Sequence, residues 1–259
     1  MLTFEQIKNE YSPEIIQRNP KAVLIEYLQY EILDSLYKQK NSEKLSFMGG
    51  TAIRIVYNSQ RFSEDLDFDN FGLNYQDFEL LLEKVMADMR NKGFEIEFRS
   101  LEKGAYHCYI KFPKLLFEND LSDHRDEKIL VRIDTVLKKR LNEPKSFILN
   151  NFGVYRKILV NSQEVILSQK IIAIIERKRS KGRDYYDVSY LLGKTNPDFD
   201  YLKIVLKIKE KSEIKNKLIE TINKNNLNDL AQDVSPFLID KNGSDRVLGF
   251  KEYIKQRVL

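Results

Sequence analysis

Along the first 150 residues, segments with the helical period of hydrophobic residues alternate with segments typical of strands. Apolar residues at helical spacing predict helices over residues 4–10, 20–40, 51–58 and 75–91. The second helix has a favourable start at Asn19-Pro20, because asparagine caps a helix and proline fits its first turn. Alternating or short apolar runs predict strands at "KLSFM", "DLDFD", "FEIEFRS", "YHCYIKF" and "KILVRIDTVL". This mixture predicts an α/β domain over residues 1–150.

From about residue 160 the pattern becomes helical. Lysines mix with leucine and isoleucine at helical spacing in "QEVILSQKIIAIIERKRS", in "RDYYDVSYLL" and in most of the tail. Proline, asparagine and glycine interrupt the periodicity in "NEPKSFILNNFGVY", where we expect the domain boundary. We therefore expect a helical domain over residues 151–259, with Tyr185, Tyr186 and Tyr190 in its core.

Composition narrows the class of protein. The 259 residues suffice for one large domain or two modest ones, and 42% hydrophobic with 32% charged residues is typical of a globular chain. The net charge of +4 is compatible with an anionic partner. The single cysteine, Cys108, excludes an intramolecular disulfide and a cysteine-built metal cage. Two histidines, His107 and His124, argue against a histidine-rich zinc site, and we expect ordinary roles for both, one near a strand and one in a loop.

Membrane segments are not predicted. No apolar stretch approaches the roughly 20 residues of a membrane span, and the N-terminus has no signal-peptide core. We therefore expect a cytoplasmic protein with no membrane partner.

The stretch "FMGGTAIRIVYNSQRFSEDLDFDN" combines acids with a glycine turn. Residues i and i+2 of a strand share a face, so Asp65 and Asp67 point the same way. Like charges this close repel unless they are protonated, paired or bound to a metal, and hard oxygen ligands suit Mg²⁺ or Mn²⁺. An adjacent strand could add Asp134 of "VRIDTVL", completing a two-metal set. Alternatively, the acids simply face water on an open antiparallel sheet.

Gly49-Gly50 lies between a predicted strand and a predicted helix. Such a turn offers backbone N–H groups and a positive helix end to a phosphate, and Ser63 adds a hydroxyl on the same approach. The alternative is an ordinary strand-to-helix turn. The spacing matches neither a Walker loop nor a dinucleotide-binding fingerprint.

A second polar cluster is predicted around Lys170. Its neighbours on the predicted helix are apolar, so its ammonium group either reaches a triphosphate or extends to solvent. Asp184 and Asp187 share a face of the next helix at i, i+3 spacing. Either acid could orient Lys170 or an arginine, and helix capping alone also explains Asp184.

Both motifs resemble those of the AbiEii/AbiGii-type abortive-infection nucleotidyltransferase toxins. That family has a Gly-Gly-Thr turn, then Arg-Phe-Ser-x-Asp-Leu-Asp, and later a lysine followed by Arg-Asp-x-x-Asp; the resemblance covers roughly residues 20–195. It implies an α+β fold, with a nucleotidyltransferase-like mixed β-sheet domain and flanking helices followed by a helical domain that contributes Lys170 and Asp184. It also implies a nucleotide site formed by Gly49, Gly50, Thr51, Ser63 and Lys170.

The resemblance further implies a metal-dependent enzyme. Asp65, Asp67 and Asp134 would bind Mg²⁺ (or Mn²⁺), and Lys170 with Asp184 would complete the catalytic set. The substrates would be a nucleoside triphosphate and an RNA acceptor, most simply the 3′ end of tRNA, and a separately encoded antitoxin would be the partner in a toxin–antitoxin or phage-defence system. Two alternatives stay open: nucleotidyl transfer to a protein or small molecule, and a nucleotide-binding regulator without chemistry.

Overall fold

The computed structural model describes residues 1–257, in two compact units. Unit 1 comprises residues 1–52, 63–140 and 144–160; unit 2 comprises residues 53–62, 141–143 and 161–259. The predicted division into two domains, 1–150 and 151–259, stays a prediction. Within the described residues, no helix is long and apolar enough to cross a membrane.

Unit 1 contains a mixed sheet. The strands described between residues 1 and 257 form one seven-stranded sheet in the order β3-β4-β5-β2-β1-β7-β6. Their bounds are β1 Leu45–Met48, β2 Leu66–Asn70, β3 Glu97–Glu102, β4 Tyr106–Phe112, β5 Ile129–Leu137, β6 Lys145–Asn151 and β7 Val154–Val160. β2 runs parallel to β5 and β1 runs parallel to β7, whereas the other neighbouring pairs are antiparallel. The α+β class expected from the sequence is confirmed.

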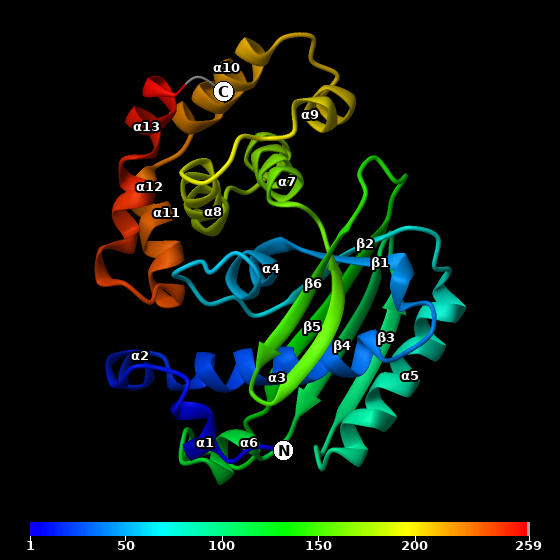
Figure 1. Ribbon diagram of the computed structural model, residues 1–259. Helices are drawn as coiled ribbons and strands as arrows, with labels where there is room; N and C mark the ends of the chain where they lie inside the picture. The colour runs from blue at the N-terminus through cyan, green and yellow to red at the C-terminus, as the bar shows by residue number, and fades with distance from the viewer. Residues whose placement is uncertain (258–259) are drawn as a thin grey trace. The chain divides into compact units, whose positions relative to one another are not determined.

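Helices cover one face of this sheet (Figure 1). The unit contains α1 Phe4–Lys8, α2 Pro13–Arg18, α3 Pro20–Tyr37, α5 Tyr75–Asn91, α6 Leu115–Glu118 and the start of α4 Gly49–Ile55. α3 packs against α5 and against β7, and α5 also contacts β3. Proline occupies the first position of α3, as the sequence predicts, and α5 buries Phe78, Leu82 and Val85 completely.

Alternation along the central strands separates a covered face from an open one. Ile129, Val131 and Ile133 of β5 are buried, whereas Leu130 and Val136 are each 45% exposed. Because side chains alternate along a strand, the odd-numbered positions face the helices and the even-numbered ones face outward. This outward face carries Arg132 and Asp134.

Unit 2 is helical, as expected. Its helices are α7 Gln163–Glu176, α8 Gly182–Leu192, α9 Phe199–Leu206, α10 Lys211–Asn223, α11 Leu227–Val234, α12 Asp245–Leu248 and α13 Phe250–Gln256. Tyr185, Tyr186 and Tyr190 of α8 are at most 7% exposed, which confirms their place in its core.

The two strands β6 and β7 were not predicted. Their connection consists of Phe152 and Gly153, with φ of +53° and +74°. Two central residues with positive φ form the tight turn that best matches the twist of a β-hairpin. The segment expected to be a domain boundary is therefore a hairpin within the sheet, with Gly153 in its turn.

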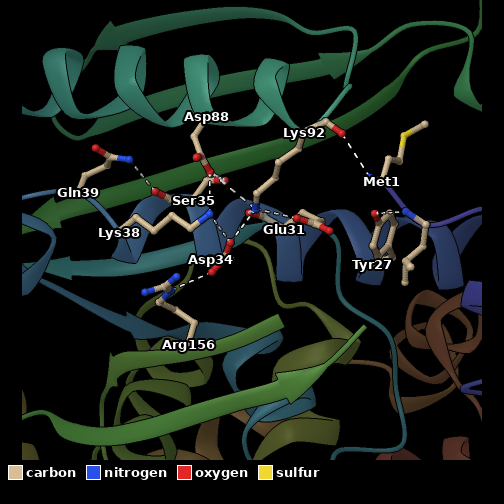
Figure 2. A network of polar contacts seen from close by, with 11 residues as sticks. Met1, Tyr27, Glu31, Asp34, Ser35, Lys38, Gln39, Asp88, Lys92 and Arg156 are labelled. Carbon is tan, nitrogen blue, oxygen red and sulfur yellow. Dashed lines mark hydrogen bonds and ion pairs between the residues drawn. The ribbon is translucent and has the colours of Figure 1, made fainter. Parts of the chain in front are cut away.

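Asp34 is at the centre of an ion-pair network in unit 1 (Figure 2). Its Oδ2 lies 2.7 Å from Lys92 Nζ and 2.9 Å from Lys38 Nζ, and its Oδ1 lies 2.8 Å from Arg156 Nε. Asp34 belongs to α3, Lys92 follows α5, and Arg156 belongs to β7. Burial would raise the pKa of Asp34, but hydrogen bonds from the three cations outweigh it and lower the pKa to about 2. The network therefore ties α3 to both neighbouring elements.

We predict that Asp34→Asn lowers the free energy of unfolding at pH 7 by about 2 kcal/mol, since each pKa unit is worth about 1.4 kcal/mol. A lowered folded-state pKa stabilises the fold above the unfolded pKa. The loss should therefore be complete above about pH 4 and disappear as the pH falls toward 2. Urea unfolding followed by far-UV circular dichroism measures both effects. The exposed Asp126→Asn is the control, and a difference that does not change with pH would contradict this role.

Candidate active site

Two of the predicted acids lie side by side on the open face of the sheet. Asp67 of β2 and Asp134 of β5 are Cα partners in a parallel pair of strands. Neighbouring strands are about 5 Å apart and partners face the same side, so both carboxylates project from one face. Asp65 lies immediately before β2. The strand pairing thus gathers three like charges, which repel one another.

Arg132 offsets part of this negative charge. It shares the face of Asp134 because it lies two residues earlier on β5. Its Nη2 donates to Asp65 Oδ2 at 2.8 Å, and its Nε lies 2.8 Å from Asp134 Oδ2. Burial alone would lower the pKa of the guanidinium, but Asp65, Asp134 and Asp67 raise it above its ordinary value. The three acids therefore stabilise the positively charged form of Arg132.

His107 contacts the other oxygen of Asp134. It lies opposite Asp134 in the antiparallel pair of β4 and β5. Its ring Nδ1 is 2.7 Å from Asp134 Oδ1. Because Arg132 and His107 hold different oxygens, the orientation of the Asp134 carboxylate is fixed from both sides.

The glycine turn ends against Asp67. Met48 is the Cα partner of Asp67, and Gly49 follows with a φ of +78°. A Cβ on Gly49 would overlap the Asp67 carboxylate and lie 2.8 Å from Asp67 Cβ. Both the backbone angle and the available space therefore require glycine. Gly49 and Gly50 begin α4, so main-chain atoms rather than a side chain lie beside the acid.

Two further contacts hold the chain that leads into Asp65. Thr51 donates its hydroxyl to the Asp65 carbonyl oxygen. The carbonyl oxygen of Ser63 accepts a hydrogen bond from Gln29 Nε2 at 2.8 Å, and Ser63 is 9% exposed. Unit 1 therefore brings together Gly49, Gly50, Thr51, Ser63, Asp65, Asp67 and Asp134.

The predicted Lys170 and Asp184 lie in unit 2. Lys170 of α7 places its Nζ 3.0 Å from Asp184 Oδ1 and 2.9 Å from Asp187 Oδ2, both on α8. Burial would lower the pKa of Lys170, but Asp187 and Asp184 raise it. The lysine is thus held in its charged form, with its side chain 14% exposed. These contacts confirm that both acids orient Lys170, two possibilities that the sequence left open.

Asp187 also binds Arg61. Arg61 Nε donates to Asp187 Oδ1 and Arg61 Nη2 donates to Asp187 Oδ2, each at 2.6 Å. This is a bidentate pair, and the two residues are 1% and 0% exposed. Burial would raise the pKa of Asp187, but Arg61 and Lys170 lower it. Asp187 therefore links the arginine of the first motif to the lysine of the second.

The carboxylates suit a divalent cation by their chemistry, since Mg²⁺ and Mn²⁺ prefer oxygen ligands. Among residues 1–257, however, no three His, Cys, Asp or Glu side chains are grouped as a metal site. Instead, Asp65 and Asp134 form ion pairs with Arg132. The donor set fits a metal ion, and Arg132 now occupies one oxygen each of Asp65 and Asp134.

The sequence reasoning missed three residues of these clusters. His107 was expected to have an ordinary role, and Arg132 and Arg61 were not considered. The signal for Arg132 was its i, i+2 spacing to Asp134, which places both on one face. The signal for Arg61 was weaker, because its partner Asp187 is 126 residues away.

Comparison with known proteins gives one family. The family model described as "Nucleotidyl transferase AbiEii toxin, Type IV TA system" matches residues 31–249. No match is found among curated proteins.

Three solved structures share the fold. JHP933 from Helicobacter pylori has a TM-score of 0.58 at 16% identity, covering 91% of this chain and 90% of that one. A putative nucleotidyltransferase from H. pylori has a TM-score of 0.57 at 16% identity, covering 90% and 94%. MenT4, a nucleotidyltransferase toxin from Mycobacterium tuberculosis, has a TM-score of 0.59 at 14% identity, covering 100% and 91%.

We predict that Asp187→Asn destabilises unit 2 strongly. It leaves Arg61 buried without its counter-charge, and breaking such a pair costs about 3–5 kcal/mol. Thermal unfolding followed by circular dichroism measures the loss. Asp200→Asn removes an exposed acid from the same unit and should change little. If both variants unfold at the wild-type temperature, the buried pair contributes nothing to stability.

Proposed function

Because the chain belongs to the AbiEii family of nucleotidyltransferase toxins, we propose that it transfers a nucleotide from a nucleoside triphosphate to the 3′ end of a tRNA, with Mg²⁺ or Mn²⁺ as the cofactor. The observation that supports this most is the in-register pair Asp67 and Asp134 beside a glycine turn. Membership of a type IV toxin–antitoxin family implies a separately encoded antitoxin as partner. We extend this to a role in phage defence.

The phosphates of the donor nucleotide lie at the glycine turn in this proposal. Gly49 and Gly50 present main-chain atoms rather than side chains, and the Ser63 hydroxyl adds a donor. Asp65, Asp67 and Asp134 would hold the cation, which would supply charge neutralisation and Lewis acidity to the triphosphate. With a cation on the acids, the Arg132 guanidinium would be free to contact a phosphate with its positive charge.

The reaction is an in-line displacement. The acceptor hydroxyl oxygen attacks the α-phosphorus, forming one P–O bond, while the bond from the α-phosphorus to the bridging oxygen breaks and pyrophosphate leaves. Asp134 helps to accept the hydroxyl proton. Its orientation by His107 favours this role, because proton transfer needs a positioned oxygen.

Lys170 acts as a positive point charge for the triphosphate in this proposal. Asp184 and Asp187 hold its Nζ in place. Asp187 is shared with the buried Arg61, so we assign it a positioning role and reserve the catalytic role for Lys170 with Asp184. Charge compensation of this kind is the main protein contribution to phosphoryl transfer.

We predict that Asp65→Ala lowers nucleotidyl transfer at least about 100-fold, because even residues that only support a metal ligand change activity by 10–100-fold. The measurement incubates the purified chain with Mg²⁺, each α-³²P nucleoside triphosphate in turn and total bacterial RNA. RNA and protein are then separated on a denaturing gel.

Label in the tRNA band that is lost in Asp65→Ala supports the proposed reaction and identifies the nucleotide. The exposed Asp126→Ala, an acid of the same unit, should retain activity. Label on protein would move the acceptor to a partner side chain, and wild-type activity in Asp65→Ala would overturn the site assignment.

A further inference from the structure

A second feature of the open face is a groove on β3 and β4, next to the carboxylates. Its volume is about 440 Å³, and it is lined by Glu97, Phe98, Arg99, Leu101, Tyr109 and Lys111. Volumes of about 300–1,000 Å³ are typical of ligand sites. None of these side chains belongs to the nucleotide or metal site proposed above.

The strand register connects the groove to the acids. Arg99 of β3 lies opposite Tyr109 of β4, and Tyr109 lies opposite Arg132 of β5. Directly opposite residues share a face, and each strand adds about 5 Å, so Arg99 is about 10 Å from the row of Arg132. Tyr109 also interacts electrostatically with Arg132. The groove therefore lies on the same face as the carboxylate site, within about two strand spacings of it.

The groove carries more positive than negative charge. Arg99 and Lys111 are exposed, and neither forms an ion pair with any residue in the described part of the chain. The one acid of the lining, Glu97, accepts from Lys128 Nζ with both carboxylate oxygens, at 2.7 and 2.9 Å. Glu97 also interacts electrostatically with Lys111, its Cα partner on β4. Three cations, Arg99, Lys111 and Lys128, therefore surround one acid, and the excess positive charge favours a ligand with negative charge.

An aromatic side chain lies next to both cations, because Tyr109 is the Cα partner of Arg99 and is two residues from Lys111 on β4. Tyr109 and Leu101 both line the groove, and both are half-buried. A cationic groove that includes an aromatic ring fits single-stranded nucleic acid, because the cations bind phosphates and the ring stacks on a base. Stacking tolerates any base, since every base has a π-face.

We propose that this groove binds the single-stranded end of an RNA acceptor, next to the nucleotide whose hydroxyl reacts. The inference rests on the proposed function, which supplies an RNA acceptor at the carboxylates. Tyr109 stacks on a base of the acceptor strand, and Arg99 and Lys111 contact its phosphates. The distance of about two strand spacings from the acids matches a binding site for nucleotides close to the reacting end.

The test measures binding directly and needs no catalysis. The full chain is titrated into a short fluorescein-labelled single-stranded RNA, and anisotropy is recorded at several salt concentrations. The variants are Tyr109→Ala and the double variant Arg99→Ala/Lys111→Ala. The control, Lys40→Ala/Lys84→Ala, removes two exposed lysines of unit 1 that likewise form no ion pair with a described residue. Circular dichroism verifies that each variant is folded.

Tyr109→Ala should weaken RNA binding at least about fivefold, the loss expected for one stacked base. Arg99→Ala/Lys111→Ala should reduce the slope of log K against log salt by about 1.4, since each phosphate contact to a single strand contributes about 0.7. The control should bind as the wild type does. Wild-type affinity and slope in both groove variants would overturn the inference, and so would a wild-type chain that does not bind the RNA.

Nucleotide binding separates this inference from the proposed function. If Tyr109→Ala weakens binding of the nucleoside triphosphate and leaves RNA binding intact, the groove belongs to the donor and the inference is wrong. If Asp65→Ala retains full transfer activity while the groove variants lose RNA binding, the site assignment fails and the groove stands. If the groove variants bind RNA as tightly as the wild type and still transfer label to it, the proposed function stands. The groove is then not the site that binds the RNA.

Discussion

Repulsion between Asp67 and Asp134 is the constraint on which the site depends. The parallel pairing of β2 with β5 sets these acids directly opposite each other on one face. Neighbouring strands are about 5 Å apart, so carboxylates on one face repel each other unless positive charge lies nearby. Arg132 provides this positive charge through its ion pairs with Asp65 and Asp134. A divalent cation would supply more positive charge than Arg132 at the same point. Mutual repulsion of the acids therefore favours binding of a cation.

The same constraint explains the neighbouring residues. Gly49 has no side chain because the Asp67 carboxylate fills that space. The carbonyl group of Asp65 is held by Thr51, and Asp134 is held by His107 and Arg132. Held in this way, the acids cannot separate to relieve their repulsion. Preorganised charge of this kind is what electrostatic catalysis requires.

A short segment serves both units. Arg61 and Phe62 belong to unit 2, whereas Ser63 and Asp65 belong to unit 1. Arg61 is bound at both ends of its guanidinium to the Asp187 carboxylate, so the start of the segment is fixed within unit 2. This gives a physical reason for the arginine that the family motif places before its acids. The arginine anchors the chain just before the acids.

Patterning predicted much of the fold because most of its helices and strands have a clear period. α5 spans the predicted residues 75–91, and the three strand segments after it are present. The hairpin of β6 and β7 was missed because Pro144, Asn150, Asn151 and Gly153 were interpreted as a boundary between domains. For the site, the acids and glycines were visible in local motifs. Arg132, His107 and Arg61 were not, because their roles depend on strand register and on a contact 126 residues apart.

The most direct test of the central claim is a titration of the full chain with Mn²⁺, with free Mn²⁺ measured by electron paramagnetic resonance. Wild type, Asp67→Asn and the exposed control Asp126→Asn are compared. The account predicts that Asp67→Asn binds Mn²⁺ at least about 10-fold more weakly, since loss of a supporting residue alone costs 10–100-fold. The control should match the wild type. Equal Mn²⁺ binding in wild type and Asp67→Asn would contradict the claim that these paired acids form a cation site.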